Sequence, residues 1–500
     1  MKKEERKERF WRVLNPKHLQ QQIDEYGYNF SMANYLLSLA ISLTVVIVCG
    51  SVFLLHWYLT AVLILLWLIL LPGMILDGYK NMYEHKRFLE VGDYIEQILY
   101  SFKTEGKILA SLRDTISLFQ TGRMRNAMKQ AVEYIEKGAY EKELYPEALS
   151  KIETMYPGRR ISMVHSFLCL VEKNGGDYNN AINLLLEDKS LWTENVLLLQ
   201  EDKRRGRNRV IAALIITMIL AAVFHGVYRS MPDTYSIVDN PVTQIGTVCY
   251  LVLNMLIFRK ANKELAGSWL ERESISDDKK VRYYWKVVTD YNGQEAWKKN
   301  LRWIAPFVII AVFCQWKGYI YGTVLMAAIG LFVINQGKIA YRISYNWLVK
   351  EINLRFPQWL IEMALLLQGN NVQVAIAKTV SDAPAVLQPE LQKMIKKLKK
   401  QPEAMEPYME FLEQFQMSYV QSAMKMMYAI SEAGHGDSQE QVKIMVQRNG
   451  KLMDKAEKIL NERSLAGISA VGYFPQITIS LQMMVNMVVF MMVFLGKMSI

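Results

Sequence analysis

Cysteine, histidine and proline are all scarce in this 500-residue chain, and their scarcity excludes several classes of structure. The 4 cysteines are scattered singly, with none at the spacing of a redox motif or a zinc-ligand pair, so we predict neither a disulfide framework nor a zinc site. The 6 histidines do not cluster in the sequence. With 13 prolines against 28 methionines, the composition favours long helices over strands and turns.

The short motifs of common enzyme classes are missing as well. The sequence contains no G-x-x-x-x-G-K-[ST] for nucleotide phosphates, no H-E-x-x-H for a zinc protease and no G-x-S-x-G for a serine hydrolase. We therefore predict that the protein is not an enzyme, and we assign it no catalytic residue, no cofactor and no metal ligand.

Charge is absent from the interiors of seven apolar stretches, in a chain that is 51% hydrophobic. A helix needs about 20 apolar residues to cross a bilayer, and shorter ones are tolerated when the bilayer thins. We therefore predict about seven transmembrane helices. They lie at 33–55, 57–76, 210–228, 242–258, 303–316, 319–337 and 474–496. The pair at 303–337 is the weakest, because "WIAPFVIIAVFCQW" is short and contains Pro306.

Basic residues are distributed very unevenly around these stretches. If the four long hydrophilic segments share one side, that side holds 56 of the 59 Lys and Arg residues, and only Arg229, Lys317 and Lys497 fall on the other. The positive-inside rule then predicts a multi-pass protein of the plasma or inner membrane with a cytoplasmic N-terminus. The net charge of +11 comes from these basic residues on the cytoplasmic side, where they can contact anionic membrane lipid. We therefore expect no nucleic-acid partner.

These segments divide the chain into eight predicted regions. They are a cytoplasmic tail (1–32), a transmembrane hairpin (33–76), a first cytoplasmic bundle (77–209), a transmembrane pair (210–258), a cytoplasmic linker (259–302), a second hairpin (303–337), a second cytoplasmic bundle (338–464) and a C-terminal transmembrane helix (465–500).

The two bundle segments match each other when one is shifted by 260 positions. The shift places Ile152 on Leu412, Val164 on Met424 and Phe167 on Met427, and it also superposes Glu172 on Glu432, Gly176 on Gly436 and Asp177 on Asp437. Apolar and polar matches at one offset indicate an internal duplication. Helical spacing of apolar residues within each copy predicts about six helices, hence an all-α protein with two homologous six-helix bundles.

Each copy contains a sharp turn between helices, in "CLVEKNGGDYNNAI" and in "AISEAGHGDSQEQV". Gly175 or Gly176 can adopt the positive φ that ends a helix, and Asp177 can cap the next helix. A plain helix–turn–helix connection explains either copy alone. The Glu four residues before the matched Gly lies at the unfavourable negative end of its helix dipole, which predicts a compensating partner. That partner is either a basic residue of the same bundle or a second protein.

Glu172, Gly175 and Gly176 in "VEKNGGDYNNAINLL", with Glu432 and Gly436 in "SEAGHGDSQEQV", carry a resemblance to a known family. Together with the hairpin, bundle and following span, they resemble the type II secretion F domain of inner-membrane platform proteins. The bundle openings, "YIEQILYSFKTEGKILASL" and "WLIEMALLLQGNNVQVAI", are similar to that domain's first two helices. The tandem arrangement looks most like two tight-adherence (Tad/Flp) pilus platform proteins joined in one chain.

The resemblance implies a non-enzymatic scaffold of a type II secretion or type IV pilus machine. Such a scaffold couples a hexameric secretion ATPase to the extraction of pilin or pseudopilin subunits, and it forms homo-oligomers. The alternative from another class is a polytopic receptor or transporter with cytoplasmic regulatory helices. It would need a ligand site outside or at the bilayer midplane, and the short outer loops and charge-free spans offer little material for one.

Overall fold

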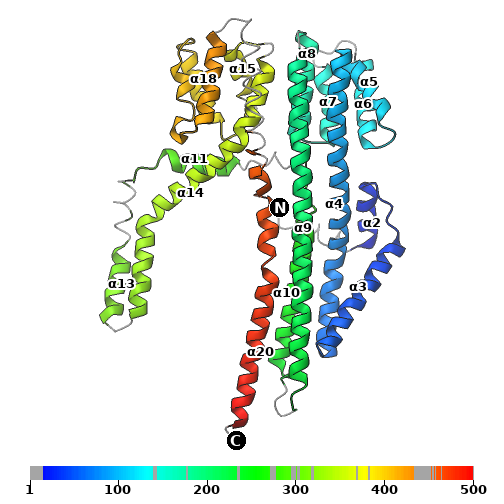
Figure 1. Cartoon of the computed structure of the whole chain (residues 1–500), viewed down its shortest axis with the longest axis vertical. Helices are drawn as coiled ribbons and strands as arrows, with labels where there is room; N and C mark the ends of the chain where they lie inside the picture. The colour runs from blue at the N-terminus through cyan, green and yellow to red at the C-terminus, as the bar shows by residue number, and fades with distance from the viewer. Residues whose placement is uncertain are drawn as a thin grey trace. The chain divides into compact units, whose positions relative to one another are not determined.

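The fold is built from helices alone. The computed structural model describes residues 15–498 except 139–143, 176–177, 233–236, 271–277, 294, 296–299, 301–303, 317–319, 368–369, 381–382, 433–451, 453–454, 457 and 463. Every regular element within these described residues is a helix, and none is a strand, which confirms the all-α class (Figure 1).

The chain divides into two compact units. The first unit comprises Met1–Asp93, Thr193–Leu270 and Asn461–Ile500, and the second comprises Tyr94–Trp192 and Glu271–Leu460. Two helices belong to both units, α4 (Trp57–Glu105) and α9 (Asn179–Arg229). Each unit therefore continues into the other through unbroken helical backbone.

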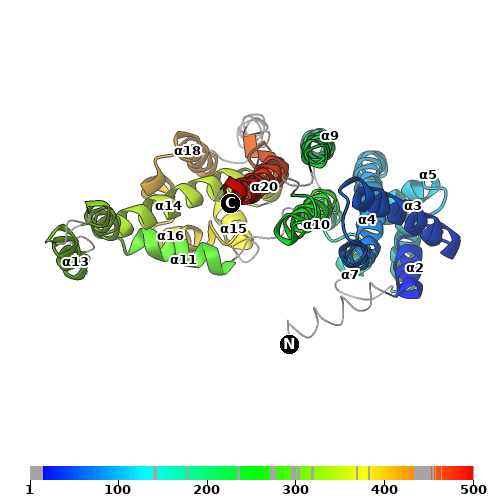
Figure 2. The same cartoon turned by 90° about the horizontal axis from the view of Figure 1, so that it is seen from below.

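The first unit contains long apolar helices, seen end-on in Figure 2, together with the short polar helix α2 (Pro16–Glu25). Besides α2 and the parts of α4 and α9, it contains α3 (Met32–Val52), α10 (Pro241–Lys263) and α20 (Phe474–Met498). Its core joins side chains from five of these helices, with Val46, Phe53, Leu63, Ala221, Tyr250, Leu251 and Ile479 buried together. Large apolar side chains such as Met492, 69% exposed, cover the outside, as expected where lipid replaces water.

Within the described residues, six helices are long and apolar enough to cross a membrane. They are Met32–Val52, Trp57–Glu105, Asn179–Arg229, Pro241–Lys263, Gly322–Leu366 and Lys458–Gly496. The seventh predicted span, 303–316, coincides with α13 (Ala305–Trp316), which has only 12 residues. A helix of that size covers about 18 Å, whereas the hydrocarbon core is about 30 Å thick. The count of seven spans therefore remains a prediction.

The central part of the predicted first bundle, 94–192, lies in the second unit, and its described residues form the end of α4, four shorter helices and the start of α9. Between the end of α4 and the start of α9 lie α5 (Ile108–Leu118), α6 (Arg123–Lys137), α7 (Leu144–Met155) and α8 (Arg159–Asn174). Their bounds follow the apolar periodicity of the sequence, because each helix buries one stripe, such as Met124, Ala127, Met128 and Ala131 of α6.

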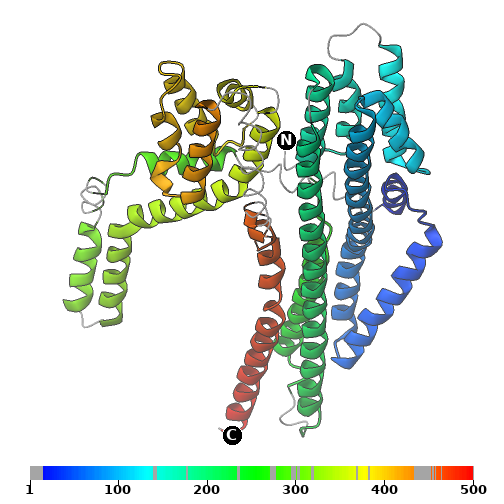
Figure 3. The same ribbon diagram turned by 45° about the horizontal axis from the view of Figure 1, so that its top comes forward.

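The predicted second bundle is described up to Glu432, because 433–451 lie outside the described residues, so the duplication stays a prediction. The bundle is built from the end of α14 (Ile320–Leu366), then α15 (Val372–Thr379), α16 (Gln388–Leu398), α17 (Glu406–Met409), the 3-10 turn η2 (Glu413–Phe415) and α18 (Ser418–Glu432). One four-residue turn of helix, α17, stands where the first bundle has the 12-residue α7. Figure 3 shows these helices gathered around the end of α14.

Part of the predicted linker 259–302 also packs into the second unit. α11 (Asp278–Thr289) lies against α14 and buries Val281 and Trp285. The Trp285 indole N–H donates to the carbonyl of Val386 at 3.1 Å, and its ring meets Phe415 edge-on at 5.5 Å. The segment is thus a structural component of the second bundle as well as a connection.

Candidate functional site

The turn after α8 has the backbone conformation predicted for a glycine. Gly175 has φ 65° and ψ −160°, and its N–H donates to the carbonyl of Val171 at 2.7 Å. A side chain at this φ is strained, which explains why glycine ends the helix here. The other predicted turn residues, Gly176, Asp177, Gly436 and Asp437, lie outside the described residues.

Glu172 has its compensating partner inside the first bundle. Its carboxylate accepts a hydrogen bond from the Ile108 N–H at 2.8 Å and pairs with the Lys107 ammonium at 3.3 Å. Ile108 is the first residue of α5, and the preceding Lys107 offers no side-chain cap of its own. The carboxylate therefore lies at the positive end of the α5 dipole, which offsets its poor position at the end of α8.

Glu432 has a different environment. It is the exposed last residue of α18, and within the described residues it forms no hydrogen bond or ion pair. The corresponding helix, α15, is capped by its own preceding residue. The Asn371 side chain accepts a hydrogen bond from the Val374 N–H at 2.9 Å. Of the two glutamates placed at one offset, Glu172 is the one with a bonding partner among the described residues.

A chain of hydrogen bonds, one buried and one partly buried, links three elements of the first bundle. The Tyr94 hydroxyl lies 2.8 Å from His165 Nε2, and His165 Nδ1 lies 2.7 Å from the Glu153 carboxylate. Burial opposes ionisation of Glu153, but the hydrogen bond to His165, the charge of His165 and a hydrogen bond from Ser162 together hold its pKa below the usual 4.5. Sequence reasoning missed this chain because Tyr94 lies 71 residues from His165.

Cys169, the one cysteine of α8, is not poised for chemistry. Burial, reinforced by the charges of Glu153 and Glu172, raises the pKa of its thiol to about 12. The thiolate, the reactive form, is therefore scarce at neutral pH. Within the described residues, no group of three or more His, Cys, Asp or Glu side chains could hold a metal ion.

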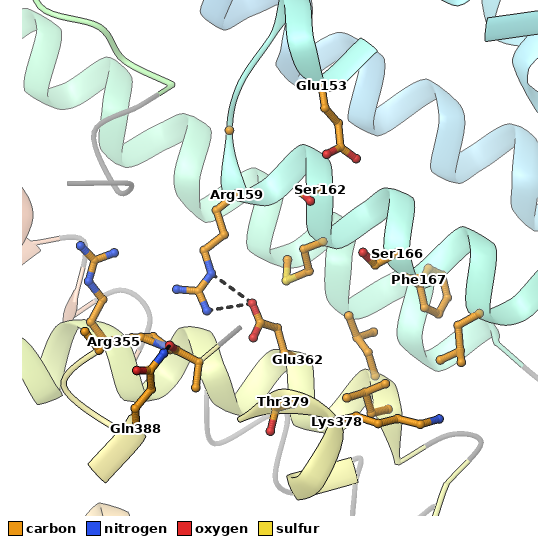
Figure 4. Close-up of a pocket in the computed structure, with 18 of the residues that line it drawn as sticks. Glu153, Arg159, Ser162, Ser166, Phe167, Arg355, Glu362, Lys378, Thr379 and Gln388 are labelled. Atoms are coloured by element: carbon orange, nitrogen blue, oxygen red, sulfur yellow. Dashed lines mark hydrogen bonds and ion pairs between the residues drawn. The ribbon is translucent and has the colours of Figure 1, made fainter. Parts of the chain in front are cut away.

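A cavity of about 790 Å³ lies in the second unit between α8 and the helices that follow α14. Figure 4 shows Arg159 of α8 reaching Glu362 of α14, and the two side chains pair at 2.8 Å. Arg159 also donates to Gln358 at 3.0 Å. Ser162, Ser166, Lys378 and Gln388 add polar groups, while Phe167 and Leu365 add apolar surface. Neither cysteine nor histidine is among the described residues that line it.

A second polar feature runs through the first unit, along the contact between α10 and α20. On α20, Gln482 donates to Thr247 at 2.9 Å and Thr478 donates to Asn254 at 3.1 Å. Gln482 also donates to Asn486 at 3.2 Å, and all five side chains are buried. The positions lie four residues apart on α20 and seven residues, about two turns, apart on α10, so they form one polar seam along the contact. Our sequence reasoning missed this seam because it sought charged residues in the spans, and these are neutral.

Comparison of this chain with models of protein families, with curated proteins and with solved structures finds no match in any of the three.

Proposed function

We propose that this chain is an inner-membrane platform protein of a type II secretion or type IV (Tad-like) pilus assembly machine. It would couple a cytoplasmic secretion ATPase to the extraction of pilin or pseudopilin subunits from the bilayer, and it would act as a homo-oligomer. The proposal rests on the sequence resemblance of the two bundle segments and on one structural observation, the continuity of three helices.

That continuity gives a physical route for coupling. α4 has 49 residues, α9 has 51 and α14 has 47, and each runs unbroken from an apolar stretch into a bundle. Long helices bend sharply at interior prolines, and α4 contains Pro72 and α14 contains Pro357, whereas α9 has none and offers the stiffest connection of the three. A displacement of the first bundle by a partner protein would therefore reach the apolar segments most directly through α9.

The proposed topology has seven spans, with both bundles in the cytoplasm. If α14 crossed the membrane and α13 did not, the second bundle would lie outside the cell. Its many lysines would then violate the positive-inside rule. α13 and α14 are packed together, and Asn300 bonds both Ile334 and Gln336 at 3.2 Å near the open end of the pair. We therefore propose that the two helices enter and leave the bilayer on the same side, with local thinning around α13.

Cysteine labelling tests this topology in a variant that lacks the native cysteines. A cysteine at Ser230 should react with an impermeant reagent in intact cells, whereas cysteines at Gln130 and Lys400 should react only after permeabilisation. Labelling of Lys400→Cys from outside would contradict the seven-span arrangement.

A break in α4 tests the coupling. Met82 lies beyond the apolar stretch and is 52% exposed, so Met82→Pro interrupts the helix without emptying a core position. Proline in a helix interior costs about 3 kcal/mol or more. We expect Met82→Pro to abolish filament assembly while membrane abundance and ATPase co-purification stay near normal, and Met82→Ala, the matched control, to assemble normally.

Two results would contradict the proposal. One is the absence of a hexameric ATPase from material that co-purifies with the wild-type chain out of native membranes. The other is normal assembly by Met82→Pro when limited proteolysis shows that α4 is interrupted.

The alternative function is that of a transporter. One observation supports it, the polar seam between α10 and α20. Polar groups inside spans often mark transport pathways. In this seam, however, Gln482, Thr247, Thr478 and Asn254 bond one another across the two helices. Such bonds are also the ordinary means by which transmembrane helices associate. Transport of a solute by the purified chain in vesicles would favour the alternative.

A further inference from the structure

α11, which lies in the predicted linker, has one buried face and one exposed face. Val281 and Trp285 are buried against the second bundle, where the Trp285 indole N–H donates to the Val386 carbonyl at 3.1 Å. A helix turns by about 100° per residue, so Tyr283, midway between these two residues in the sequence, projects from the opposite side. We call this side the outer face, and the exposed residues on it and at its edges are Lys279, Lys280, Arg282, Tyr283 and Lys286.

The outer face is strongly basic. α11 holds four basic residues and one acidic residue, Asp278, at its start, and Asp290 follows its end. In the part of the chain that the structure describes, Lys279, Arg282 and Lys286 form no hydrogen bond or ion pair. The positive charge of the outer face is therefore available to an anionic partner.

Aromatic and basic side chains continue from α11 to the apolar part of α14. Tyr291, two residues after α11, stacks on Tyr341 at 4.4 Å. Tyr341 lies four residues beyond the predicted span 319–337, and its neighbours Lys338 and Arg342 are exposed. Four residues of helix rise about 6 Å, and the headgroup layer is about 5–8 Å thick, so Tyr341 falls within that layer. Tyrosines and basic residues next to a span are typical of it.

The orientation of α11 turns the outer face toward the same layer. Figures 1 and 3 show α11 lying across the direction of α13 and of the apolar part of α14. In Figure 1 the helices α15 and α18 lie on one side of α11, and the apolar ends of α13 and α14 lie on the other. Figure 2, seen from those apolar ends, shows α11 uncovered beside them. A helix that lies in the membrane plane with a basic polar face is typical of membrane-surface binding.

We infer that the outer face of α11, together with Lys338 and Arg342 of α14, binds the anionic lipid headgroups of the cytoplasmic leaflet. Lysine and arginine are attracted to the negative surface of that leaflet, and a tyrosine such as Tyr283 can insert its ring at headgroup level. The contact would hold the second bundle against the membrane. An acidic protein would match the charge equally well, but the tyrosine pair at the edge of the span favours lipid.

The inference rests on the proposed topology, in which α13 and α14 enter the bilayer from the cytoplasm, and it does not depend on filament assembly.

Fluorescence quenching in nanodiscs tests the contact in the full-length chain. Tyr283→Cys, in the variant that lacks the native cysteines, carries a bimane label. The discs contain phosphatidylcholine with a nitroxide on its headgroup, with or without phosphatidylglycerol. Val374→Cys is the matched control, because Val374 is 41% exposed on α15, away from the apolar ends of α13 and α14 in Figure 1. We expect quenching at 283 that increases with phosphatidylglycerol and falls at high salt, and little quenching at 374.

Paired lysine variants separate the outer face from the overall charge of the chain. Each basic residue near an anionic surface raises the occupancy of that surface by about fivefold. Lys279→Gln/Lys286→Gln should therefore raise the mole fraction of phosphatidylglycerol at half-maximal quenching by at least about fivefold. Lys129→Gln/Lys137→Gln makes the same change of charge at exposed positions of α6 and should leave that value within about twofold, because salt screens distant charges.

Three outcomes would overturn the inference. The first is equal quenching at 283 and 374, and the second is an equal effect of the two lysine pairs. The third is shielding of the label at 283 from iodide by polyglutamate in detergent without quenching in the discs, which would assign the outer face to an acidic protein.

A failed inference can be told apart from a failed topology. If the label at 283 stays unquenched while Lys400→Cys reacts only after permeabilisation, the lipid contact is wrong and the topology stands. If Lys400→Cys reacts from outside, the topology fails and the lipid contact fails with it.

Discussion

The two bundles of the second unit start their second helix in different ways. α5 begins after Lys107, which has no capping side chain, and the Glu172 carboxylate from α8 accepts the first N–H. α15 begins after Asn371, which caps its own helix. The same requirement, a partner for free N–H groups at a helix start, is thus met once by a distant residue and once by an adjacent one. Glu432 does not cap α15, and its side chain is exposed.

A second difference between the two bundles concerns a buried position near the start of α8 and of α18. At the offset of 260, Arg160 of α8 corresponds to Val420 of α18, and both are buried. Arg160 pairs with Asp188 through two hydrogen bonds, at 2.8 and 3.3 Å, and its guanidinium lies 5.1 Å from the Trp192 ring. The first bundle therefore depends on a buried ion pair where the second depends on apolar packing.

The largest expected effect comes from breaking that ion pair. Arg160→Met leaves Asp188 buried without its partner, which should destabilise the first bundle by about 3–5 kcal/mol. The double variant Arg160→Met/Asp188→Leu should recover most of the loss, because apolar pairs of similar volume replace buried ion pairs well. Thermal unfolding in detergent measures both, and equal destabilisation by the single and double variants would contradict this account.

The next effect concerns the turn at Gly175. No atom lies within 4 Å of a Cβ added there, so the cost of Gly175→Ala comes from its φ of 65° alone. We expect a loss of about 1–2 kcal/mol in the free energy of unfolding. Gly138→Ala is the matched control at the end of α6, where φ is −97°, an angle that alanine also adopts. Similar values for both variants would show that the positive φ carries no strain.

Glu172 and Glu432 give the sharpest test of the comparison. Glu172→Ala removes the cap of α5 and should cost about 1 kcal/mol. Lys107→Ala removes only a partner that is 68% exposed and should cost less. Glu432→Ala should leave stability unchanged, so any loss of assembly or ATPase co-purification in that variant would identify it as a partner contact. Equal destabilisation at Glu172 and Glu432 would contradict the difference seen in the structure.

The smallest expected effect is a pH dependence in the first bundle. Because the pKa of Glu153 is lowered in the folded state, its contribution is fully present above its usual value of 4.5 and is lost as the pH falls below it. Glu153→Gln should therefore flatten part of the decline in stability on the acid side and leave the neutral range little changed. Unfolding midpoints measured between pH 3 and 7 check this, and an unaltered acid limb in Glu153→Gln would exclude the mechanism.

Several features could be read from the sequence because they depend on local pattern. The helix ends of the first bundle follow apolar periodicity and glycine, since a glycine such as Gly175 ends a helix wherever positive φ is required. The long apolar helices follow from runs without charge. The sequence pattern predicts helix length less well where tertiary packing determines it. α17 is a single turn of helix, whereas the matched stretch of the first copy forms the 12-residue α7.

What the sequence by itself determined is the all-helical class, most of the long apolar helices and the glycine that ends α8, because backbone propensity and hydropathy act over a few turns of chain. Tertiary structure alone decided which polar groups meet. Glu172 accepts a hydrogen bond from the start of α5, 64 residues away in the sequence. Thr478 and Asn254 are hydrogen-bonded across 224 residues. A hydrogen bond acts over about 3 Å, so it is specified only after packing has brought distant segments together.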